Sequence, residues 1–258
     1  YFGDGVYDAM FTVDHVPLQL DDHLRRFYRS AKKIEIDIPM PFEELRAMVL
    51  DFCRKIDSPD AMAYVQATRG VGMRGHAYRF AGNTPSLWVW VKPDMLDPMD
   101  RSYKAITMED TRYFHCDIKT INLLPAVIYT QRAEEAGCDE TILHRGDRVT
   151  ECAHSNVHIL KDGALKTAPC DNLILPGITR AHRIAQCRKM GIPVIEEPFT
   201  VREMMEADEI FFTSASALCC RIDEIDGQKV GGCAPELIAK IQKAAWDEAL
   251  EEVRQING

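Results

Sequence analysis

Two short segments with turn residues at their centres restrict this chain to folds that contain antiparallel β-sheet. The segment "ETILHRGDRVTE" places Gly146 and Asp147 between two strand-like runs, and "NVHILKDGALKTAP" does the same with Asp162 and Gly163. Pairs of glycine and aspartate favour tight hairpin turns. An all-helical fold is therefore excluded.

Other runs predict a mixture of further strands and helices. Aromatic and β-branched residues concentrate in "AMAYVQATRG", "SLWVWVKP" and "YKAITMED", which predicts three strands. Apolar residues recur at helical spacing from Leu24 onward, after Asp21 or Asp22 as the expected helix cap. Further helices are expected over residues 42–56, 122–136, 177–190, 202–206 and 235–256.

The order of these elements predicts an α/β (mixed α+β) chain with two domains. The first section reads as helices laid on a small sheet, and the section after "TRYFHCD", residues 111–117, is rich in hairpins. We therefore expect a small α/β domain over residues 1–112 and a larger domain over residues 113–258. With 258 residues, 46% of them hydrophobic, the chain is long enough to bury a substantial core.

Composition limits the classes of molecule that the protein is expected to bind. A net charge of −9 argues against a nucleic-acid or anionic-membrane binder and favours small molecules. The chain has no apolar run long enough to span a bilayer and no signal-peptide layout, so no membrane and a cytoplasmic location are expected. Nine cysteines without Cys-x-x-Cys pairs read as reduced thiols, and no metal is expected. Because the chain begins at Tyr1 inside a structured-looking stretch, preceding sequence is expected.

One lysine stands out. Lys119 lies in the mostly apolar run "CDIKTINLLP". The cost of desolvating an ammonium means that such a lysine reaches solvent, finds a partner, or is kept partly neutral. A partly neutral lysine is a nucleophile that forms an imine with an aldehyde, of which pyridoxal phosphate is the commonest in proteins.

Several other stretches offer what that cofactor requires, although each also has an ordinary structural reading. Gly177, Ile178 and Thr179 open a helix whose free N–H groups favour a phosphate. A carboxylate such as Glu151 would keep the ring nitrogen protonated. The basic loop "TRGVGMRGHAYRF" could bind a substrate carboxylate. More backbone and hydroxyl donors come from "TSAS", that is Thr213, Ser214, Ala215 and Ser216.

Together these stretches resemble the fold-type IV pyridoxal-phosphate enzymes, closest to the D-amino-acid aminotransferases among them. The resemblance rests on "YFGDGVYD", "HLRRFYRSAKKI", "TRG", "CDIKTINLLP", "AGCDETILHRGDRVTE", "SNVHILKDG", "LPGITR" and "DEIFFTSAS", in one order along nearly the whole chain. It implies a two-domain fold whose larger domain has helices around a β-barrel-like core. It also implies a homodimer with a shared active site.

The resemblance further implies roles for individual residues. Lys119 would bind pyridoxal 5′-phosphate covalently and shuttle a proton between the substrate α-carbon and the cofactor. Glu151 would pair with the ring nitrogen, Arg26 of "HLRRFY" would bind the phosphate, and Leu175 would pack against the ring. The remaining phosphate-lining residues would be Gly177, Ile178, Thr179, Ser214, Ala215 and Ser216.

The substrate side resembles the carboxylate trap of the D-amino-acid aminotransferases. Arg74 and His76, contributed by the neighbouring subunit, would act together with Tyr7. The sequence departs from that pattern at Cys152-Ala153-His154, where small and hydroxyl-bearing residues are expected, and at Ala215, where a hydroxyl is expected. These departures bear on the side-chain pocket and on local hydrogen bonding.

The expected function is therefore transamination between a D-amino acid and a 2-oxo acid, such as D-alanine and 2-oxoglutarate. Alternatives on the same fold are an L-branched-chain aminotransferase, an aminodeoxychorismate lyase and an (R)-amine transaminase. An alternative of another class is a non-catalytic protein that binds the cofactor. The Arg-x-His pair argues against the first two alternatives.

Overall fold

The structure is a computed structural model and describes residues 2–82 and 84–257. It divides into two compact units. Unit 1 comprises residues 1–95, 118–123 and 249–258, and unit 2 comprises residues 96–117 and 124–248. These ranges differ from the border predicted after residue 112, most notably because the segment that carries Lys119 belongs to unit 1.

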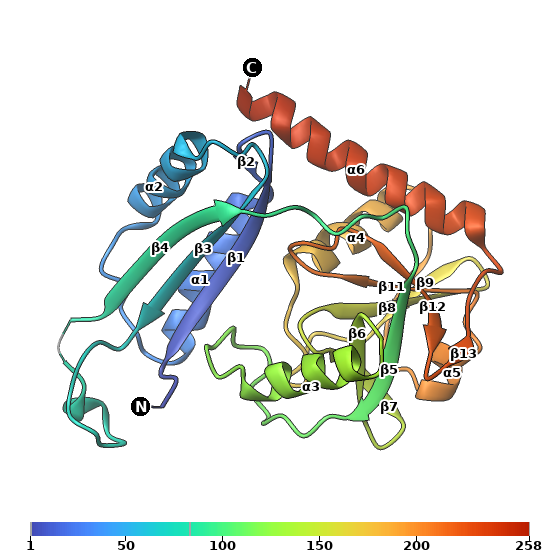
Figure 1. Cartoon of the computed structure of the whole chain (residues 1–258), viewed down its shortest axis with the longest axis horizontal. Helices are drawn as coiled ribbons and strands as arrows, with labels where there is room; N and C mark the ends of the chain where they lie inside the picture. The colour runs from blue at the N-terminus through green and yellow to red at the C-terminus, as the bar shows by residue number, and fades with distance from the viewer. Residues whose placement is uncertain (1, 83, 258) are drawn as a thin grey trace. The chain divides into compact units, whose positions relative to one another are not determined.

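Unit 1 is a four-stranded sheet with two helices packed on one face. The strand order is β2-β1-β3-β4, and neighbouring strands are antiparallel. Leu24, Phe27, Leu45 and Val49 of the helices pack on alternate strand residues such as Val65, which is why the strands alternate between buried and partly exposed positions. The elements are β1 (Gly5–Val13), β2 (Val16–Pro17), α1 (Leu20–Lys33), α2 (Phe42–Lys55), β3 (Ala61–Thr68), η1 (Tyr78–Phe80) and β4 (Ser86–Pro93) (Figure 1).

Unit 2 is built on a nine-stranded sheet. The strand order is β10-β9-β8-β11-β12-β5-β6-β7, with β13 paired to β12. Its strands are β5 (Tyr103–Glu109), β6 (Glu140–Arg145), β7 (Arg148–Cys152), β8 (Asn156–Lys161), β9 (Ala164–Thr167), β10 (Val194–Glu196), β11 (Glu209–Thr213), β12 (Cys220–Ile225) and β13 (Gln228–Lys229) (Figure 1). Its helices are α3 (Leu124–Glu135), α4 (Ile178–Lys189) and α5 (Val201–Met205), and α6 (Pro235–Asn257) has its first part in this unit.

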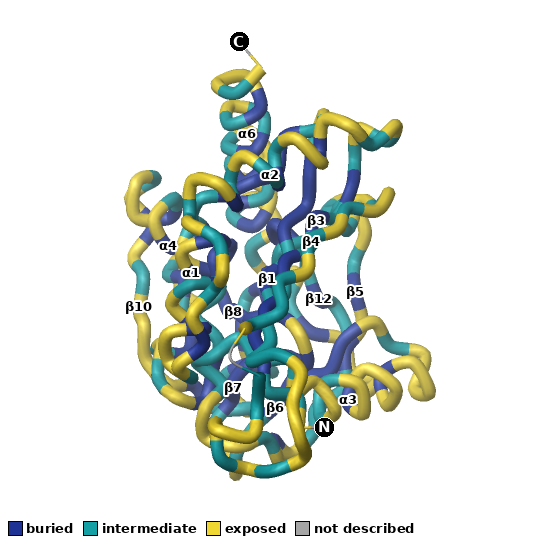
Figure 2. Tube along the Cα trace, turned by 90° about the vertical axis from the view of Figure 1, so that its left-hand side faces the viewer, coloured by how far each residue is buried: buried dark blue, intermediate teal, exposed yellow. Residues whose placement is uncertain are grey.

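The core of unit 2 consists of apolar side chains from many of these strands. Ile142, Ile159, Ile210 and Ile222 are fully or almost fully buried in one cluster. Figure 2 shows the same pattern, with buried residues along the strands and exposed residues in the connecting loops. The sheet therefore provides a rigid support for side chains at strand ends.

The local predictions are largely confirmed. Both hairpins form, β6 with β7 and β8 with β9, and both are antiparallel. Their turn residues adopt positive φ, at 60° for Gly146, 49° for Asp162 and 76° for Gly163, a region in which glycine carries no steric penalty. The predicted helix over residues 42–56 is α2, and its start at Phe42 agrees with the prediction.

Two local predictions are wrong. The run "YKAITMED" is a strand, but β5 belongs to the sheet of unit 2, where it pairs in parallel with β6 and β12 and buries Tyr103 and Ala105. The cap of α1 is Gln19, whose backbone N–H binds the carboxylate of Glu252, and the predicted caps Asp21 and Asp22 lie in the first turn. Acidic residues are also favourable there because they face the positive end of the helix dipole.

Candidate active site

Lys119 is positioned by a backbone contact that adds its segment to the edge of β1. The amide of Tyr7 donates to the carbonyl of Lys119 at 3.0 Å, and the amide of Ile121 donates to the carbonyl of Gly5 at 3.1 Å. Val6 and Thr120 form an isolated antiparallel bridge between these two bonds. The lysine is thus held on the small sheet of unit 1 by pairing across more than a hundred residues of sequence.

The amine of Lys119 lies against an aromatic side chain. Its Nζ donates to the hydroxyl of Tyr7 at 3.2 Å and lies 4.3 Å from the centre of the same ring. Tyr7 stacks on Tyr64 with ring centres 5.5 Å apart, and Tyr64 stacks on Trp90 at 4.8 Å. Burial raises the pKa of Tyr64 to about 12. The structure therefore brings together two predicted site residues, Lys119 and Tyr7, and supports them with a row of stacked rings.

Arg26, the predicted phosphate ligand, lies in a buried cluster of unit 1. Its Nε and Nη2 donate to the two carboxylate oxygens of Asp8 at 2.9 and 2.7 Å. Nδ1 of His23 lies 2.8 Å from Asp8. Burial lowers the pKa of His23, and its contact with Asp8 opposes that shift. The guanidinium of Arg26 is thus fixed in orientation by one carboxylate.

Arg74 and His76 lie together on the exposed loop between β3 and β4. The ring of His76 is 4.9 Å from that of Phe2, and the guanidinium of Arg74 lies 5.4 Å from the centre of the same ring. Gly75 separates the two, and a Cβ at this position would come within 2.3 Å of the ring of Phe80. The loop therefore presents an arginine and a histidine on a shared aromatic support.

Glu151 lies at the end of β7 in unit 2 and is 5% exposed. Its Oε1 accepts a 2.5 Å bond from Nη1 of Arg112, and its Oε2 accepts bonds from Nδ2 of Asn156 and the amide of Leu175, both at 2.9 Å. Burial raises the pKa of the Glu151 carboxyl, and the charge of Arg112 opposes that rise. The backbone of Leu175 thus helps to orient this carboxylate.

The other residues predicted to bind phosphate lie in unit 2. Helix α4 starts at Ile178 after Gly177, and no side chain caps its first turn. The hydroxyl of Thr179 donates to the carbonyl of Ser214 at 2.7 Å, which ties the helix to the loop after β11. Within that loop the hydroxyl of Ser214 accepts the amides of Ser216 and Ala217. An uncapped helix start beside a loop with two serine hydroxyls suits an anion.

Asn156 connects this helix start to Glu151. Besides its bond to Glu151, its Nδ2 donates to the carbonyl of Leu175 at 3.0 Å. A Cβ at Gly177 would come within 2.0 Å of its Oδ1, so the position requires glycine. Sequence reasoning missed Asn156, which binds Glu151 and Leu175, respectively 5 and 19 residues away, and Arg112, which binds Glu151 39 residues away. Asn156 lies within "SNVHILKDG" and Arg112 within "TRYFHCD", but neither pattern by itself assigns the residue a role.

The residues that depart from the expected pattern also have defined surroundings. Nδ1 of His154 lies 2.8 Å from Oε2 of Glu140, and the histidine side chain is 60% exposed whereas that of Glu140 is 1% exposed. Glu140 also accepts the hydroxyl of Ser155 at 2.7 Å. This contact therefore holds the side chain of His154 against unit 2. Ala215 is partly buried between Ser214 and Ser216.

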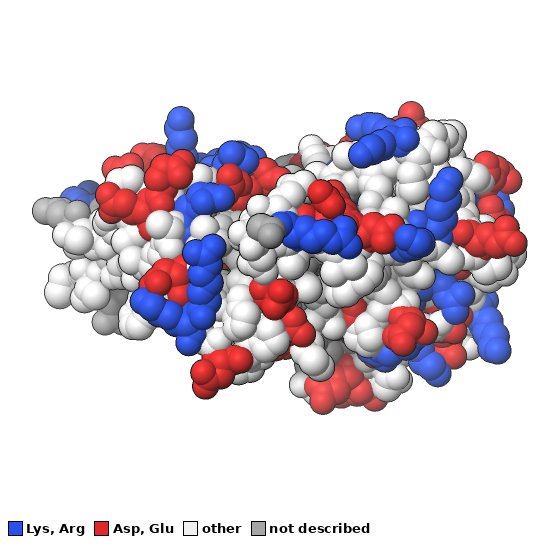
Figure 3. Space-filling model, turned by 90° about the horizontal axis from the view of Figure 1, so that it is seen from above, with Lys and Arg blue, Asp and Glu red and all other residues white. Residues whose placement is uncertain are grey.

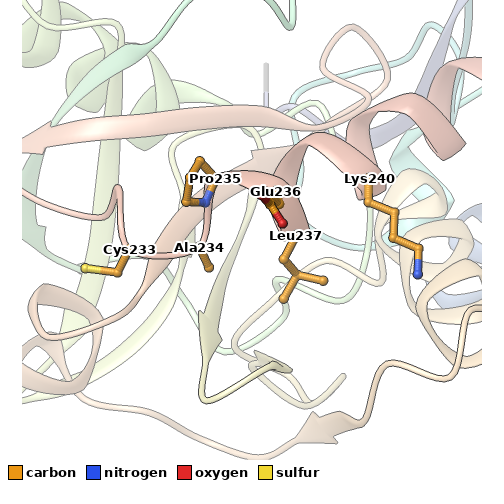
Figure 4. A pocket seen from close by; sticks show the side chains of 6 residues that line it. All are labelled: Cys233, Ala234, Pro235, Glu236, Leu237 and Lys240. Carbon is orange, nitrogen blue, oxygen red and sulfur yellow. The ribbon is translucent and has the colours of Figure 1, made fainter.

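Other surface features do not contain predicted site residues. Within residues 2–82 and 84–257, no helix is both long and apolar enough to cross a membrane, and no metal-binding cluster of His, Cys, Asp and Glu is found. Acidic and basic side chains are interspersed on the face shown in Figure 3. An open hollow at the start of α6 is lined by Cys233, Ala234, Pro235, Glu236, Leu237 and Lys240 (Figure 4).

Comparison with known proteins gives the family of this chain. Residues 5–225 match the family model for amino-transferase class IV. The chain belongs to the amino-transferase class IV family, and it is a transferase.

Its relatives agree with this family. A D-alanine aminotransferase of Bacillus licheniformis is 37% identical over 254 residues, which are 97% of this chain and 89% of that protein. A D-alanine aminotransferase of Listeria monocytogenes serotype 1/2a (strain 10403S) is 40% identical over 235 residues, 89% of this chain and 81% of that protein. The solved structure of the Escherichia coli branched-chain amino acid aminotransferase matches with a TM-score of 0.85 at 25% identity, covering 96% of this chain and 85% of that one. The predicted mixed α/β, fold-type IV architecture is therefore confirmed.

Proposed function

We propose that this protein is a D-amino-acid aminotransferase that uses pyridoxal 5′-phosphate. The observation that carries the proposal is the 37–40% identity to D-alanine aminotransferases over 89–97% of the chain. Its substrates would be a D-amino acid and a 2-oxo acid, with D-alanine, D-glutamate and 2-oxoglutarate as the expected types. We place the reaction in the cytoplasm.

The side chains of both units fit the requirements of that cofactor. Its phosphate would be held by the uncapped start of α4 at Ile178 and by Thr179, Ser214, Ala215 and Ser216, with Arg26 as the counter-charge. The glycine that the packing of Asn156 requires at position 177 supports this assignment, because it leaves the first turn of α4 without a side chain in front of it. Glu151 would accept a hydrogen bond from the protonated ring nitrogen, and Leu175 would pack against the ring.

When bound, the cofactor supplies an electron sink for the bond that breaks at the substrate α-carbon. The amine of Lys119 would hold the cofactor and then move the proton to and from that carbon. The hydroxyl of Tyr7, 3.2 Å from this amine, would orient it. A buried Glu151 would keep the ring nitrogen charged, because a carboxylate favours a neighbouring cation in a site of low polarity.

The carboxylate of the substrate would be bound by Arg74 and His76 with Tyr7, and we propose that the loop acts on the active site of a second copy in a homodimer. Side chains on this loop support that role. Val71 and Met73 are 87% and 79% exposed, and apolar side chains at such exposure are typical of contact surfaces. A charge-assisted arginine fork gives such a trap its selectivity for a carboxylate.

A half-reaction tests the proposal directly. The cofactor-loaded protein is mixed separately with D-alanine, D-glutamate, L-leucine and L-glutamate, and the absorbance change from the aldehyde to the amine form of the cofactor is followed. Conversion by the D-amino acids alone is the expected result. Conversion by L-leucine would favour the branched-chain reaction, and no conversion by any amino acid would leave a protein that only binds the cofactor.

A further inference from the structure

Glu151 is one end of a buried chain of three charges. The guanidinium of Arg112 donates through Nη1 to Glu151, and through Nε and Nη2 to the two oxygens of Asp110, both at 2.9 Å. The side chains of Asp110, Arg112 and Glu151 are 0%, 12% and 7% exposed. One cation thus lies between two carboxylates, of which only Glu151 is assigned a role in the proposed function.

Asp110 accepts further hydrogen bonds besides those from the guanidinium of Arg112. It accepts the backbone amide of Arg112 at 3.0 Å, the hydroxyl of Thr150 at 3.0 Å and Nε of Arg145 at 3.2 Å. Arg145 also donates to the carbonyl of Arg112 at 2.7 Å. These contacts fix both the side chain and the backbone from which Arg112 reaches Glu151.

The charges in this chain oppose one another. Alone, Arg112 would stabilise the ionised form of Glu151 strongly, because the pair is close and largely shielded from water. Asp110 offsets that effect, since its negative charge is shared with the same guanidinium and repels Glu151. Arg145 contacts Asp110, and the thiols of Cys116, Cys152 and Cys170 are coupled to the charge of Glu151; burial raises the pKa of each of these thiols.

We propose that Asp110 is a positioning residue for Glu151: it holds Arg112 in the orientation that reaches Glu151 and offsets its charge. Because Asp110 shares the guanidinium, Arg112 does not fully occupy Glu151, and the carboxylate can accept a hydrogen bond from the protonated nitrogen of the bound ring. This inference rests on the proposed function for the role of Glu151. The coupling between Asp110 and Glu151 itself is a property of the protein without cofactor.

The test measures the titration of Glu151 directly. Protein without cofactor is labelled with glutamate that carries ¹³C at its carboxyl, and Glu151→Gln identifies the Glu151 resonance. Asp110→Asn is expected to lower the titration midpoint of Glu151, because the charge of Arg112 is then unopposed. Arg112→Gln is expected to raise it, because Glu151 then loses its cation.

A matched control distinguishes the effect of removing a charge from the effect of disturbing the packing around Asp110. Thr150→Val removes a hydroxyl that binds Asp110 but leaves every charge in place, so the midpoint should barely move. A midpoint that rises or stays unchanged in Asp110→Asn overturns the inference. If Asp110→Asn does not fold, Arg145→Gln, at a side chain that is 18% exposed, serves instead. It should shift the midpoint upward by less than Arg112→Gln, and an unchanged midpoint overturns the inference.

A second readout connects the coupling to the cofactor. Equilibrium dialysis of pyridoxal phosphate should show weaker binding to Asp110→Asn and to Glu151→Gln than to Thr150→Val. Equal binding by all three would overturn the role of the coupling in holding the ring. If the midpoints shift as expected while the half-reaction with D-amino acids fails, the coupling stands and the proposed function is wrong. A working half-reaction with an unmoved midpoint overturns the inference alone.

Discussion

Replacing Asp8 by asparagine should destabilise unit 1 severely. Asp8 is completely buried and receives two hydrogen bonds from Arg26 and one from His23. Although burial alone would raise the pKa of this carboxyl, Arg26 and His23 hold it well below its usual range. Asparagine keeps the shape of the side chain but removes the charge. It therefore removes the carboxylate that offsets the guanidinium of Arg26, a residue buried to 4% exposure.

The size of the effect follows from that lost counter-charge. Breaking a buried ion pair by removing one partner costs about 3–5 kcal/mol, against a total free energy of unfolding of about 5–15 kcal/mol. With a urea dependence of about 2–3 kcal/mol per molar, a loss of about 4 kcal/mol lowers the urea midpoint by about 1.3–2 M. Asp4→Asn is the matched control, because Asp4 also binds an arginine, Arg69, but its side chain is 38% exposed. Loss of the Asp4–Arg69 ion pair in Asp4→Asn should cost about 1 kcal/mol or less of the free energy of unfolding.

Tryptophan fluorescence makes the measurement specific to unit 1. Of the three tryptophans, Trp88 and Trp90 lie in unit 1 and Trp246 lies in unit 2. In a Trp246→Phe background, urea unfolding followed by fluorescence therefore reports the unit that contains Asp8. This choice matters because a chain with two units need not unfold in one step.

The pH dependence gives the decisive check. The folded-state pKa of Asp8 is depressed, so its stabilisation is present above the unfolded-state pKa of about 3.9 and is lost as the pH falls towards the folded-state value. The difference between the original protein and Asp8→Asn should be full at pH 7 and shrink below about pH 4. A difference that is constant from pH 7 to pH 3, or no larger than that of Asp4→Asn, would refute the reasoning.

Three further predictions concern the proposed function. Lys119→Ala should abolish the half-reaction and the covalent attachment of the cofactor while circular dichroism stays unchanged, and retention of the cofactor absorbance after gel filtration would contradict this. Arg74→Ala should raise the KM for D-amino acids by about 10–100-fold, the scale of losing a charge-assisted hydrogen bond of about 1.5–3 kcal/mol, with Arg79→Ala on the same loop as the control. An equal effect of both variants would count against a specific trap. Gly177→Ala should weaken cofactor binding in equilibrium dialysis, because the Cβ of the alanine would meet Oδ1 of Asn156 at 2.0 Å and displace the start of α4. Unchanged binding would show that this loop adjusts freely.

The sequence predicts what is determined by neighbouring residues. Both hairpins were predictable because glycine with aspartate in each turn selects a tight reversal of the chain, and α2 was predictable from the helical spacing of Leu45 and Val49. The strand character of residues 103–109 was equally local. The sheet to which that strand belongs was not, because its partners are set by the burial of Tyr103 and Ala105 against distant strands.

The same limit applies to the candidate site. The lysine was singled out by its apolar neighbours, but its place on β1 comes from backbone pairing with Gly5 and Tyr7, for which side-chain patterns carry no signal. The carboxylate of Glu151 was identified through a resemblance, whereas Arg112 was not, since it stands 39 residues earlier in a stretch that reads as a domain border. Ion pairs between distant segments become visible only once the fold brings them together.

Asn156 shows how such a distant contact sets the dimensions of the site. A single side chain at the start of β8 binds Glu151 and the carbonyl of Leu175, and its Oδ1 lies against Gly177. The spacing between the buried carboxylate and the start of α4 is therefore fixed by one amide rather than by two independent loops. A ligand with a ring nitrogen at one end and a phosphate at the other requires this spacing to be constant. Asn156→Ala should therefore weaken the binding of pyridoxal phosphate more than the binding of inorganic phosphate. Equal losses for both ligands in equilibrium dialysis would show that Asn156 supports the anion site alone.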